Sequence, residues 1–247
     1  MARRAAVRNS TAEWRAIAEG PDLLFHIHSI AGKEGGGWTE EEFYASGRED
    51  WEQFLSHWKH FEPTVGGRCV EIGCGAGRLT APLSAYFDAV DAVDVSSAMI
   101  ALTKAKVGDN VTFHEVCSNV IPLEDSSVDA VFTVQVLQHL DNLAAIRAYI
   151  AEALRVLKPG GTIMAHVMLP GREISLARKL LWEAKLIRSR YGLSRSQTHT
   201  SVRMVFPTAG QALHMFRDVG FADVELRGFP VTSTGGFHSF FLGRKRR

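Results

Sequence analysis

Residues 70–80 read Val-Glu-Ile-Gly-Cys-Gly-Ala-Gly-Arg-Leu-Thr, and the fold can be worked out from this stretch. A short apolar run with strand character stops at a G-x-G-x-G turn, and a helix-like segment begins directly after it. Glycines at alternate positions permit positive φ values and a close approach of the backbone to a ligand. The N–H groups that open the next helix can meet an anionic or carboxylate-bearing group. The stretch therefore predicts a loop that binds a nucleotide-type cofactor.

The chain around this loop alternates short β-type runs with helical segments. Strands are predicted at 68–72, 89–93, 111–116, 128–134, 162–168, 221–229 and 236–243, and helices at 78–87, 97–106, 142–157 and 208–219. This alternation predicts an α/β fold with a doubly wound, mostly parallel seven-stranded sheet of the Rossmann-like type. The last two strands fit an antiparallel edge. The stretch Lys158-Pro159-Gly160-Gly161 predicts a sharp turn between the third of these helices and the fifth strand.

Residues 1–66 differ in character and predict an N-terminal helical cap, and 67–247 form the Rossmann-like domain with a helical lid insertion at 170–206. A helix is expected from Thr39 to Phe61, with Thr39 as N-cap and Glu42 three residues on. Its aromatic side chains have two interpretations. They bury the helix against the core, or Trp38 and Phe43 close over the bound ligands.

Composition narrows the classes of function. The chain has 247 residues, 46% of them hydrophobic and 22% charged, and a net charge of +1, which predicts no nucleic-acid or anionic-membrane partner. No apolar run reaches the roughly 18–20 residues that span a bilayer. The three cysteines are an odd count and indicate reduced thiols in a cytoplasmic protein. No group of His, Asp or Glu has metal-ligand spacing, so no metal is predicted.

Further features stand at distances suited to an adenosine. Asp94 ends the second strand, 17 residues after Gly77, where a carboxylate can accept both ribose hydroxyls. Met99 can pack on an adenine face, and Ser118-Asn119 follows the third strand, where it can edge the adenine. Arg78 stands where a dinucleotide loop of the G-x-G-x-x-G type needs glycine.

Taken in order, these residues resemble the class I S-adenosylmethionine-dependent methyltransferases of the small-molecule type. The matching motifs are Glu71-x-Gly73-x-Gly75-x-Gly77, Val93-Asp94-x-Ser96, Ile121-Pro122-Leu123-Glu124-Asp125-x-Ser127-x-Asp129, Val136-Leu137-Gln138-His139 and Leu157-Lys158-Pro159-Gly160-Gly161.

The resemblance implies S-adenosylmethionine as the cofactor and assigns residues to its parts. The three loop glycines, Gly73, Gly75 and Gly77, would approach the methionine part of the cofactor. Gln135 would face the methionine end of the cofactor. Asp94 would hold the ribose, and Ser118 and Asn119 would flank the adenine. Val95 and Met99 are expected among the other cofactor-binding residues. Glu71 is expected to fix the loop. Cys117 departs from the pattern, because many relatives carry an adenine-directed Asp there.

Methyl transfer from a sulfonium requires placement of the nucleophile and management of one proton. A hydroxyl acceptor benefits from a general base, and histidine is the usual choice near neutral pH. The candidates are His139, after the fourth strand, and His166, in the fifth. For His139 the alternative is a role in organising its loop. His199, in the predicted lid, is interpreted as a solvated side chain.

The preferred acceptor is the hydroxyl group of a small molecule. The sequence lacks the Asn/Asp-Pro-Pro-aromatic motif of enzymes that methylate nucleic-acid bases, and Thr133-Val134-Gln135-Val136 stands there instead. Two alternatives stay open. One is N-methylation of a small molecule, a protein or RNA. The other is a non-catalytic, cofactor-binding subunit that activates a partner methyltransferase. The oligomeric state is not predicted.

Overall fold

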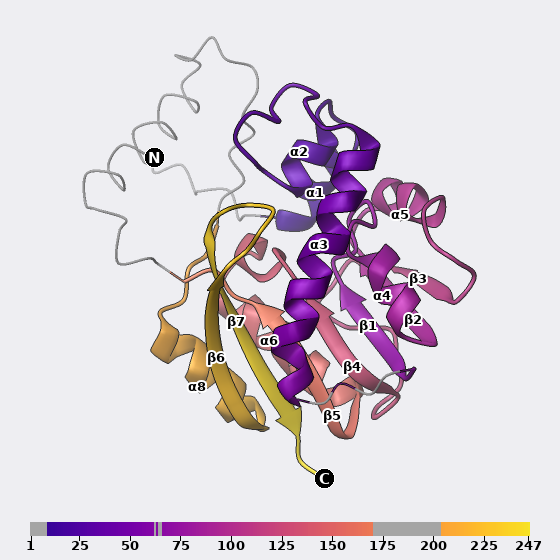
Figure 1. The fold of residues 1–247 in the computed structure, drawn as a ribbon. Coiled ribbons are helices and arrows are strands. Elements are labelled where there is room, and N and C mark those ends of the chain that lie inside the picture. The colour runs from indigo at the N-terminus through magenta and orange to yellow at the C-terminus, as the bar shows by residue number, and fades with distance from the viewer. Residues whose placement is uncertain (1–8, 62, 64–65, 170–203) are drawn as a thin grey trace, which may run out of the picture.

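A seven-stranded sheet forms the centre of the computed structural model, which describes residues 9–61, 63, 66–169 and 204–247 (Figure 1). The strand order is β3-β2-β1-β4-β5-β7-β6. The strands are β1 Arg68–Ile72, β2 Ala89–Asp94, β3 Val111–Glu115, β4 Val128–Thr133, β5 Leu157–His166, β6 Phe221–Pro230 and β7 Phe237–Lys245. The first five pair in parallel, and β7 is antiparallel to both β5 and β6. The predicted Rossmann-like sheet with an antiparallel edge is confirmed.

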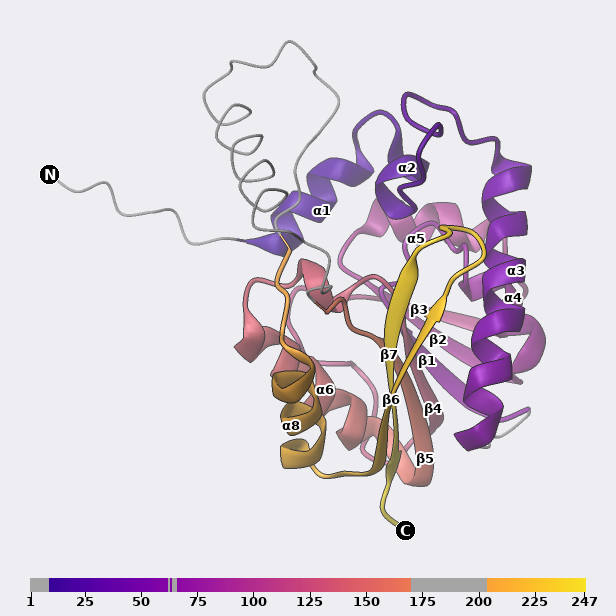
Figure 2. The same ribbon diagram turned by 60° about the vertical axis from the view of Figure 1, so that its left-hand side comes forward.

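Helices cover both faces of the sheet, with α3 and α4 on one face and α6 and α8 on the other (Figure 2). The helices are α1 Ser10–Ala18, α2 Leu23–Ile27, α3 Glu40–Trp58, α4 Thr80–Tyr86, α5 Ser97–Lys104, α6 Leu143–Val156 and α8 Ala209–Val219, with short 3-10 helices η1 Lys59–Phe61 and η2 Leu137–His139. Because each strand alternates its side chains, Cys69 packs toward α3 and α4 while Val70 packs toward α6 and α8. Two hydrophobic layers therefore enclose the sheet.

The predicted helix after Thr39 forms with its predicted cap. The Thr39 side chain accepts the Glu42 N–H, and the Glu42 side chain accepts the Thr39 N–H, which is a complete capping box. Trp51, Phe54 and Trp58 lie buried along one side of α3 against the sheet. These aromatics belong to the core, as the first of the two interpretations expected.

The predicted sharp turn at Lys158–Gly161 is wrong, because these residues lie inside β5. The strand starts at Leu157, paired with Val128, and the pairing shifts before Thr162 aligns with Ala130. Gly160 takes φ 84° at this irregularity. The Pro-Gly-Gly signal therefore marks a bulge that the strand absorbs, since glycine supplies the conformation that a bulge needs.

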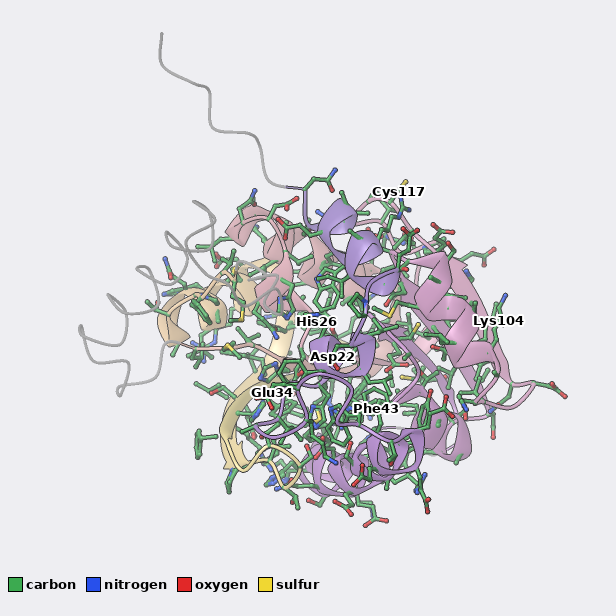
Figure 3. All side chains as sticks on the ribbon, turned by 90° about the horizontal axis from the view of Figure 1, so that it is seen from above. Asp22, His26, Glu34, Phe43, Lys104 and Cys117 are labelled. Carbon is green, nitrogen blue, oxygen red and sulfur yellow. The ribbon has the colours of Figure 1, made fainter. Side chains whose placement is uncertain are left out.

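Helices α1 and α2 fall within the predicted N-terminal helical cap, although the sequence did not predict their bounds, and they lie over the end of the sheet at the top of Figure 1. The loop from α2 to α3 folds around Asp22, whose carboxylate accepts the N–H groups of Gly35 at 2.6 Å and Gly36 at 2.9 Å. Asp22 and Glu34 lie near the middle of this end when it is viewed from above (Figure 3). The core of the predicted lid, 170–203, and His199 fall outside the described residues.

No helix among residues 9–61, 66–169 and 204–247 combines the length and the hydropathy that crossing a bilayer requires.

Candidate active site

The glycine loop connects β1 to α4 and takes the conformation that its sequence predicts. Gly73, Gly75 and Gly77 have φ values of 79°, 54° and 85°, in the region that favours glycine. The N–H groups of Gly73 and Cys74 donate to the Val93 carbonyl at 2.7 and 3.1 Å, which ties the loop to the end of β2.

At two of these positions, close packing is a second reason why the residue has to be glycine. A Cβ at position 73 would stand 2.2 Å from Val136 Cγ2, and one at position 77 would stand 2.7 Å from Thr103 Cγ2. Gly73 and Gly75 line a cavity, whereas Gly77 does not and packs against Thr103 of α5 instead. The loop therefore forms part of the cavity wall through Gly73 and Gly75 and packs against α5 through Gly77.

The cavity lies at the carboxyl ends of the parallel strands and has a volume of about 510 Å³. It brings together most of the residues predicted for the cofactor and one of the two predicted bases. These residues are Glu71, Gly73, Gly75, Asp94, Val95, Met99, Ser118, Asn119, Gln135 and His139. A volume of this size suits a single cofactor-sized or drug-sized molecule.

Asp94 is held so that part of its carboxylate stays available. Its Oδ2 accepts the Gly75 N–H at 2.8 Å, and its Oδ1 accepts the Ser96 N–H at 3.0 Å. A carboxylate offers about four acceptor positions, so each oxygen keeps capacity for a further donor. Burial raises the pKa of Asp94, and these backbone N–H groups counteract the shift. The site can accept two adjacent hydroxyl groups.

The apolar part of the cavity lies beside Asp94. Met99 is buried in the first turns of α5, which Ser96 caps by accepting the Met99 N–H at 3.4 Å. Val95 and Val116 line the same region. The Ser118 carbonyl accepts the Tyr149 hydroxyl at 3.3 Å, and Ser118 and Asn119 line the cavity as polar residues. Apolar walls with a few polar groups suit a heteroaromatic base.

Glu71 is a buried carboxyl in the cavity wall. It is 3% exposed on β1, and its Oε2 accepts the hydroxyl of Thr80 at 2.6 Å. Burial raises its pKa to about 8, with the Thr80 hydrogen bond acting in the opposite direction. The contact joins β1 to the first residue of α4 across the glycine loop. This geometry agrees with the expected role of fixing the loop.

The residue after Gly77 forms a buried ion pair. The guanidinium of Arg78 contacts the Asp50 carboxylate of α3 at 2.6 Å, and both side chains are almost fully buried. Asp50 also accepts the hydroxyl of Ser233 at 2.7 Å from the loop between β6 and β7. Arg78 lines the cavity. Its pairing with α3 could not be read from its place in the loop motif.

His139 lies in η2 and lines the cavity. The amide nitrogen of Gln138 is 3.4 Å from its Nε2. Because an amide nitrogen only donates, this contact requires an unprotonated Nε2. The ring also meets Trp14 edge-on, with centroids 5.0 Å apart. His139 thus lines the cavity with its acceptor nitrogen hydrogen-bonded to Gln138.

His166 lies elsewhere. It is 1% exposed at the end of β5, does not line the cavity, and contacts the backbone N–H of Gln135 and the ring of His238. The structure therefore brings only His139, of the two predicted bases, to the wall of the cavity.

Helix α1 forms a wall of the cavity that the sequence did not reveal. Trp14 lines it together with Asn9, Ser10 and Thr11. The Ser10 N–H donates to Asp141 Oδ1 at 2.8 Å, and Arg15 Nε donates to the Val95 carbonyl at 2.7 Å. These contacts hold α1 to the segment after η2 and to the segment after β2. The sequence feature that could have predicted the start of α1 is Asn9, which caps the helix by accepting the Ala12 N–H.

Trp38 and Phe43, the aromatics considered for closure over the ligands, do not line this cavity. Phe43 is fully buried, and Trp38 stacks on His28 with centroids 5.6 Å apart. Among the described residues, the Trp and Tyr side chains that line the cavity are Trp14 and Tyr149.

These features fit an adenosine cofactor that ends in an amino acid. The Asp94 oxygens suit a ribose diol, and the Met99 region suits the base. The backbone of the glycine loop can approach the amino-acid part of such a cofactor closely. Among the residues that the structure describes, no three His, Cys, Asp or Glu side chains gather as a metal-ligand group.

Comparison with known proteins relates this chain to methyltransferases. Residues 70–165 match the family model of the methyltransferase domain. A demethylmenaquinone methyltransferase of Tropheryma whipplei is 31% identical over 116 residues, which cover 44% of this chain and 47% of the relative. Phosphoethanolamine N-methyltransferase 1 of Triticum aestivum is 35% identical over 107 residues, which cover 41% of this chain and 21% of the relative. The matches thus span less than half of these relatives.

The fold extends the likeness to nearly the whole chain. Magnesium protoporphyrin IX methyltransferase of Synechocystis PCC 6803, solved with bound SAH, superposes with a TM-score of 0.65. The superposition covers 96% of this chain and 99% of that one at 14% identity, so it is evidence of the fold alone.

Proposed function

We propose that this chain, which belongs to the class I S-adenosylmethionine-dependent methyltransferases through residues 70–165, transfers a methyl group to a hydroxyl group of a small molecule. S-adenosylmethionine, when bound, supplies a methyl group already activated on a sulfonium. The remaining tasks belong to the protein. It has to bind the cofactor, align the acceptor and remove one proton.

Cofactor binding would rest on Asp94 and the glycine loop. The single observation that carries the proposal is the Asp94 carboxylate, held by the N–H groups of Gly75 and Ser96 in the lining of a cavity of about 510 Å³. Each oxygen keeps a free acceptor position for one ribose hydroxyl. Val95, Met99 and Ser118 would then enclose the adenine, and Gln135 would lie toward the methionine end.

A hydroxyl acceptor is favoured by the groups that line the cavity. Of its described lining residues, His139 is the one imidazole, and its Nε2 would exchange the hydrogen bond from Gln138 for the proton of the acceptor hydroxyl. The carboxyl groups are otherwise engaged: Asp94 binds the loop, Asp141 accepts the Ser10 N–H, and Glu71 has a pKa of about 8. His139 is therefore the residue we assign as general base.

The test begins with binding of S-adenosylhomocysteine, measured by calorimetry. Asp94→Ala is expected to weaken it by about a hundredfold, because two charge-assisted hydrogen bonds are worth ~3 kcal/mol or more together. His139→Ala is expected to leave this affinity within about threefold. Unchanged binding by Asp94→Ala would contradict the ribose assignment.

The second stage is turnover. Cofactor with a labelled methyl group is incubated with the protein and panels of small phenols, alcohols and amines, then with protein and RNA fractions, and the product is identified by mass spectrometry. Label on oxygen, lost in His139→Ala, supports the proposal. Label on nitrogen, or on a macromolecule, replaces it with the corresponding alternative. Binding without turnover against any acceptor indicates a cofactor-binding partner subunit.

A further inference from the structure

Gln135 holds an uncommon backbone conformation in the wall of the cavity. It follows the end of β4 by two residues and has φ 59°, which non-glycine residues seldom adopt. Such a conformation costs about 1–3 kcal/mol and persists where the surroundings enforce it. The Gln135 N–H donates to Nδ1 of His166 at 3.3 Å. His166 thus lies behind the cavity wall and anchors the strained residue.

This one backbone N–H sets the direction of a series of hydrogen bonds. Because it can only donate, Nδ1 of His166 has to be unprotonated, and the neutral ring carries its proton on Nε2. That Nε2–H donates to Nδ1 of His238 at 3.1 Å. The proton of His238 then resides on its Nε2, which donates to Thr234 Oγ1 at 2.9 Å. The Thr234 hydroxyl donates in turn to the Val231 carbonyl at 3.3 Å.

The antiparallel pairing of β5 with β7 brings the two rings together. His166 pairs with Phe240, and His238 lies two residues earlier on β7, on the same face. Diagonal neighbours of this kind contact each other through long side chains. Thr234 and Val231 belong to the loop between β6 and β7, so the series connects that loop to the cavity wall. We call the set His166, His238 and Thr234 the histidine relay.

Both rings of the histidine relay are neutral. Burial lowers the pKa of His166 to about 3, with His238 and His139 acting in the same direction. Burial also lowers the pKa of His238, which faces the opposing charges of Asp50 and Arg78. Neutral rings have one donor and one acceptor each, which is what the hydrogen bonds need. With both nitrogens of His166 engaged, its role is to position a neighbour.

We propose that His166 and His238 are positioning residues that hold Gln135 in its left-handed conformation and thereby shape the cofactor cavity. That this cavity binds the cofactor rests on the proposed function. The relay itself does not, because its protonation pattern can be measured without any ligand.

The first experiment measures that pattern directly. The full chain is labelled with 15N-histidine, and the ring nitrogens are assigned by comparison with His166→Gln and His238→Asn. We expect His166 to show an unprotonated Nδ1 and a protonated Nε2, with the same arrangement for His238. A protonated Nδ1 on His166 overturns the proposal, whether or not the protein binds S-adenosylhomocysteine.

The second experiment separates hydrogen bonding from packing, with S-adenosylhomocysteine binding as the readout. His238→Phe keeps a ring but removes the acceptor of the His166 Nε2–H, so the orientation of the His166 ring is no longer fixed and its hold on the Gln135 N–H weakens. Binding should weaken about tenfold, since restoring the conformation costs ~1.4 kcal/mol. His238→Asn places an amide oxygen near the position of Nδ1 and is expected to stay within about threefold of the natural chain.

Thr232→Ala is the matched control. It removes a hydroxyl contact between the same loop and Gln53 of α3, at 3.2 Å, and leaves the relay intact. Equal losses in His238→Phe and His238→Asn, or a loss of the same size in Thr232→Ala, would assign the effect to packing of the hairpin and overturn the proposal. Failure of the natural chain to bind S-adenosylhomocysteine would instead contradict the proposed function, and the labelling result would still decide the relay.

Discussion

Replacement of Glu71 by Gln tests whether a neutral carboxyl lies in the wall of the cavity. Glu71 is 3% exposed, and burial raises its pKa from 4.5 to about 8. A folded-state pKa above the unfolded one means that the unfolded chain loses its proton first as the pH rises. The contribution of Glu71 to stability is therefore complete below pH 4.5 and is lost progressively up to about pH 8.

The size of the effect follows from the shift. One pKa unit corresponds to about 1.4 kcal/mol, so ionisation of the unfolded chain lowers the free energy of unfolding by ~1.4 kcal/mol for each pH unit in this window. Between pH 5 and pH 8 the loss is about 3 kcal/mol. Glu71→Gln has no proton to lose and keeps a side chain that can bond the Thr80 hydroxyl. The variant should therefore gain about 3 kcal/mol relative to the natural chain over that range.

The assay is urea unfolding at pH 5, 6, 7 and 8, followed by tryptophan fluorescence. The difference between the two proteins isolates Glu71, because all other titrating groups are common to both. Glu52→Gln, at an exposed position of α3, controls for removal of a carboxyl group as such and is expected to show no trend. A difference between natural chain and Glu71→Gln that stays constant within about 0.5 kcal/mol would refute the reasoning.

Three other substitutions address the surroundings of the cavity. Burial lowers the pKa of His28 to about 3, so as the pH falls below 6.5 the unfolded chain binds a proton that the folded chain does not, and the stability of the natural chain decreases. His28→Phe should therefore gain ~2 kcal/mol over the natural chain between pH 7.5 and pH 5, and urea unfolding that shows no gain would contradict this. Asp50→Asn leaves the buried Arg78 without its counter-charge and should cost about 3–5 kcal/mol in the same assay, and a cost below ~1 kcal/mol would disprove the pairing. Trp14→Phe should abolish the change in tryptophan emission on binding S-adenosylhomocysteine, and full retention of that change would place Trp14 away from the ligand.

Local features of the chain were enough to predict the sheet and much of the cavity. The three loop glycines take positive φ values in this chain, and Thr39 with Glu42 caps a helix through contacts three residues apart. Alternating apolar runs predicted the strands within a few residues, except at the start of β5. Because the carboxyl ends of parallel strands meet at one edge, the order of motifs also placed Asp94, Gln135 and His139 around a common cavity.

Contacts between distant segments decided the rest. Trp14 reaches the cavity because α1 is anchored at Asp141 and Val95, which are 131 and 80 residues away from their partners Ser10 and Arg15. The period of a strand does not state which neighbour a side chain meets. The contact of His166 with Gln135 emerged only from the pairing of β5 with β4, and its contact with His238 only from the pairing of β5 with β7.

Burial of a side chain also depends on segments that are distant in the sequence. Glu71 is one carboxyl among many in the sequence, and its raised pKa arises from the layers that cover β1. Local conformation depends on neighbours along the chain, whereas solvation and protonation depend on everything that packs around a group. The chemistry of this cavity therefore became visible only when the chain was folded.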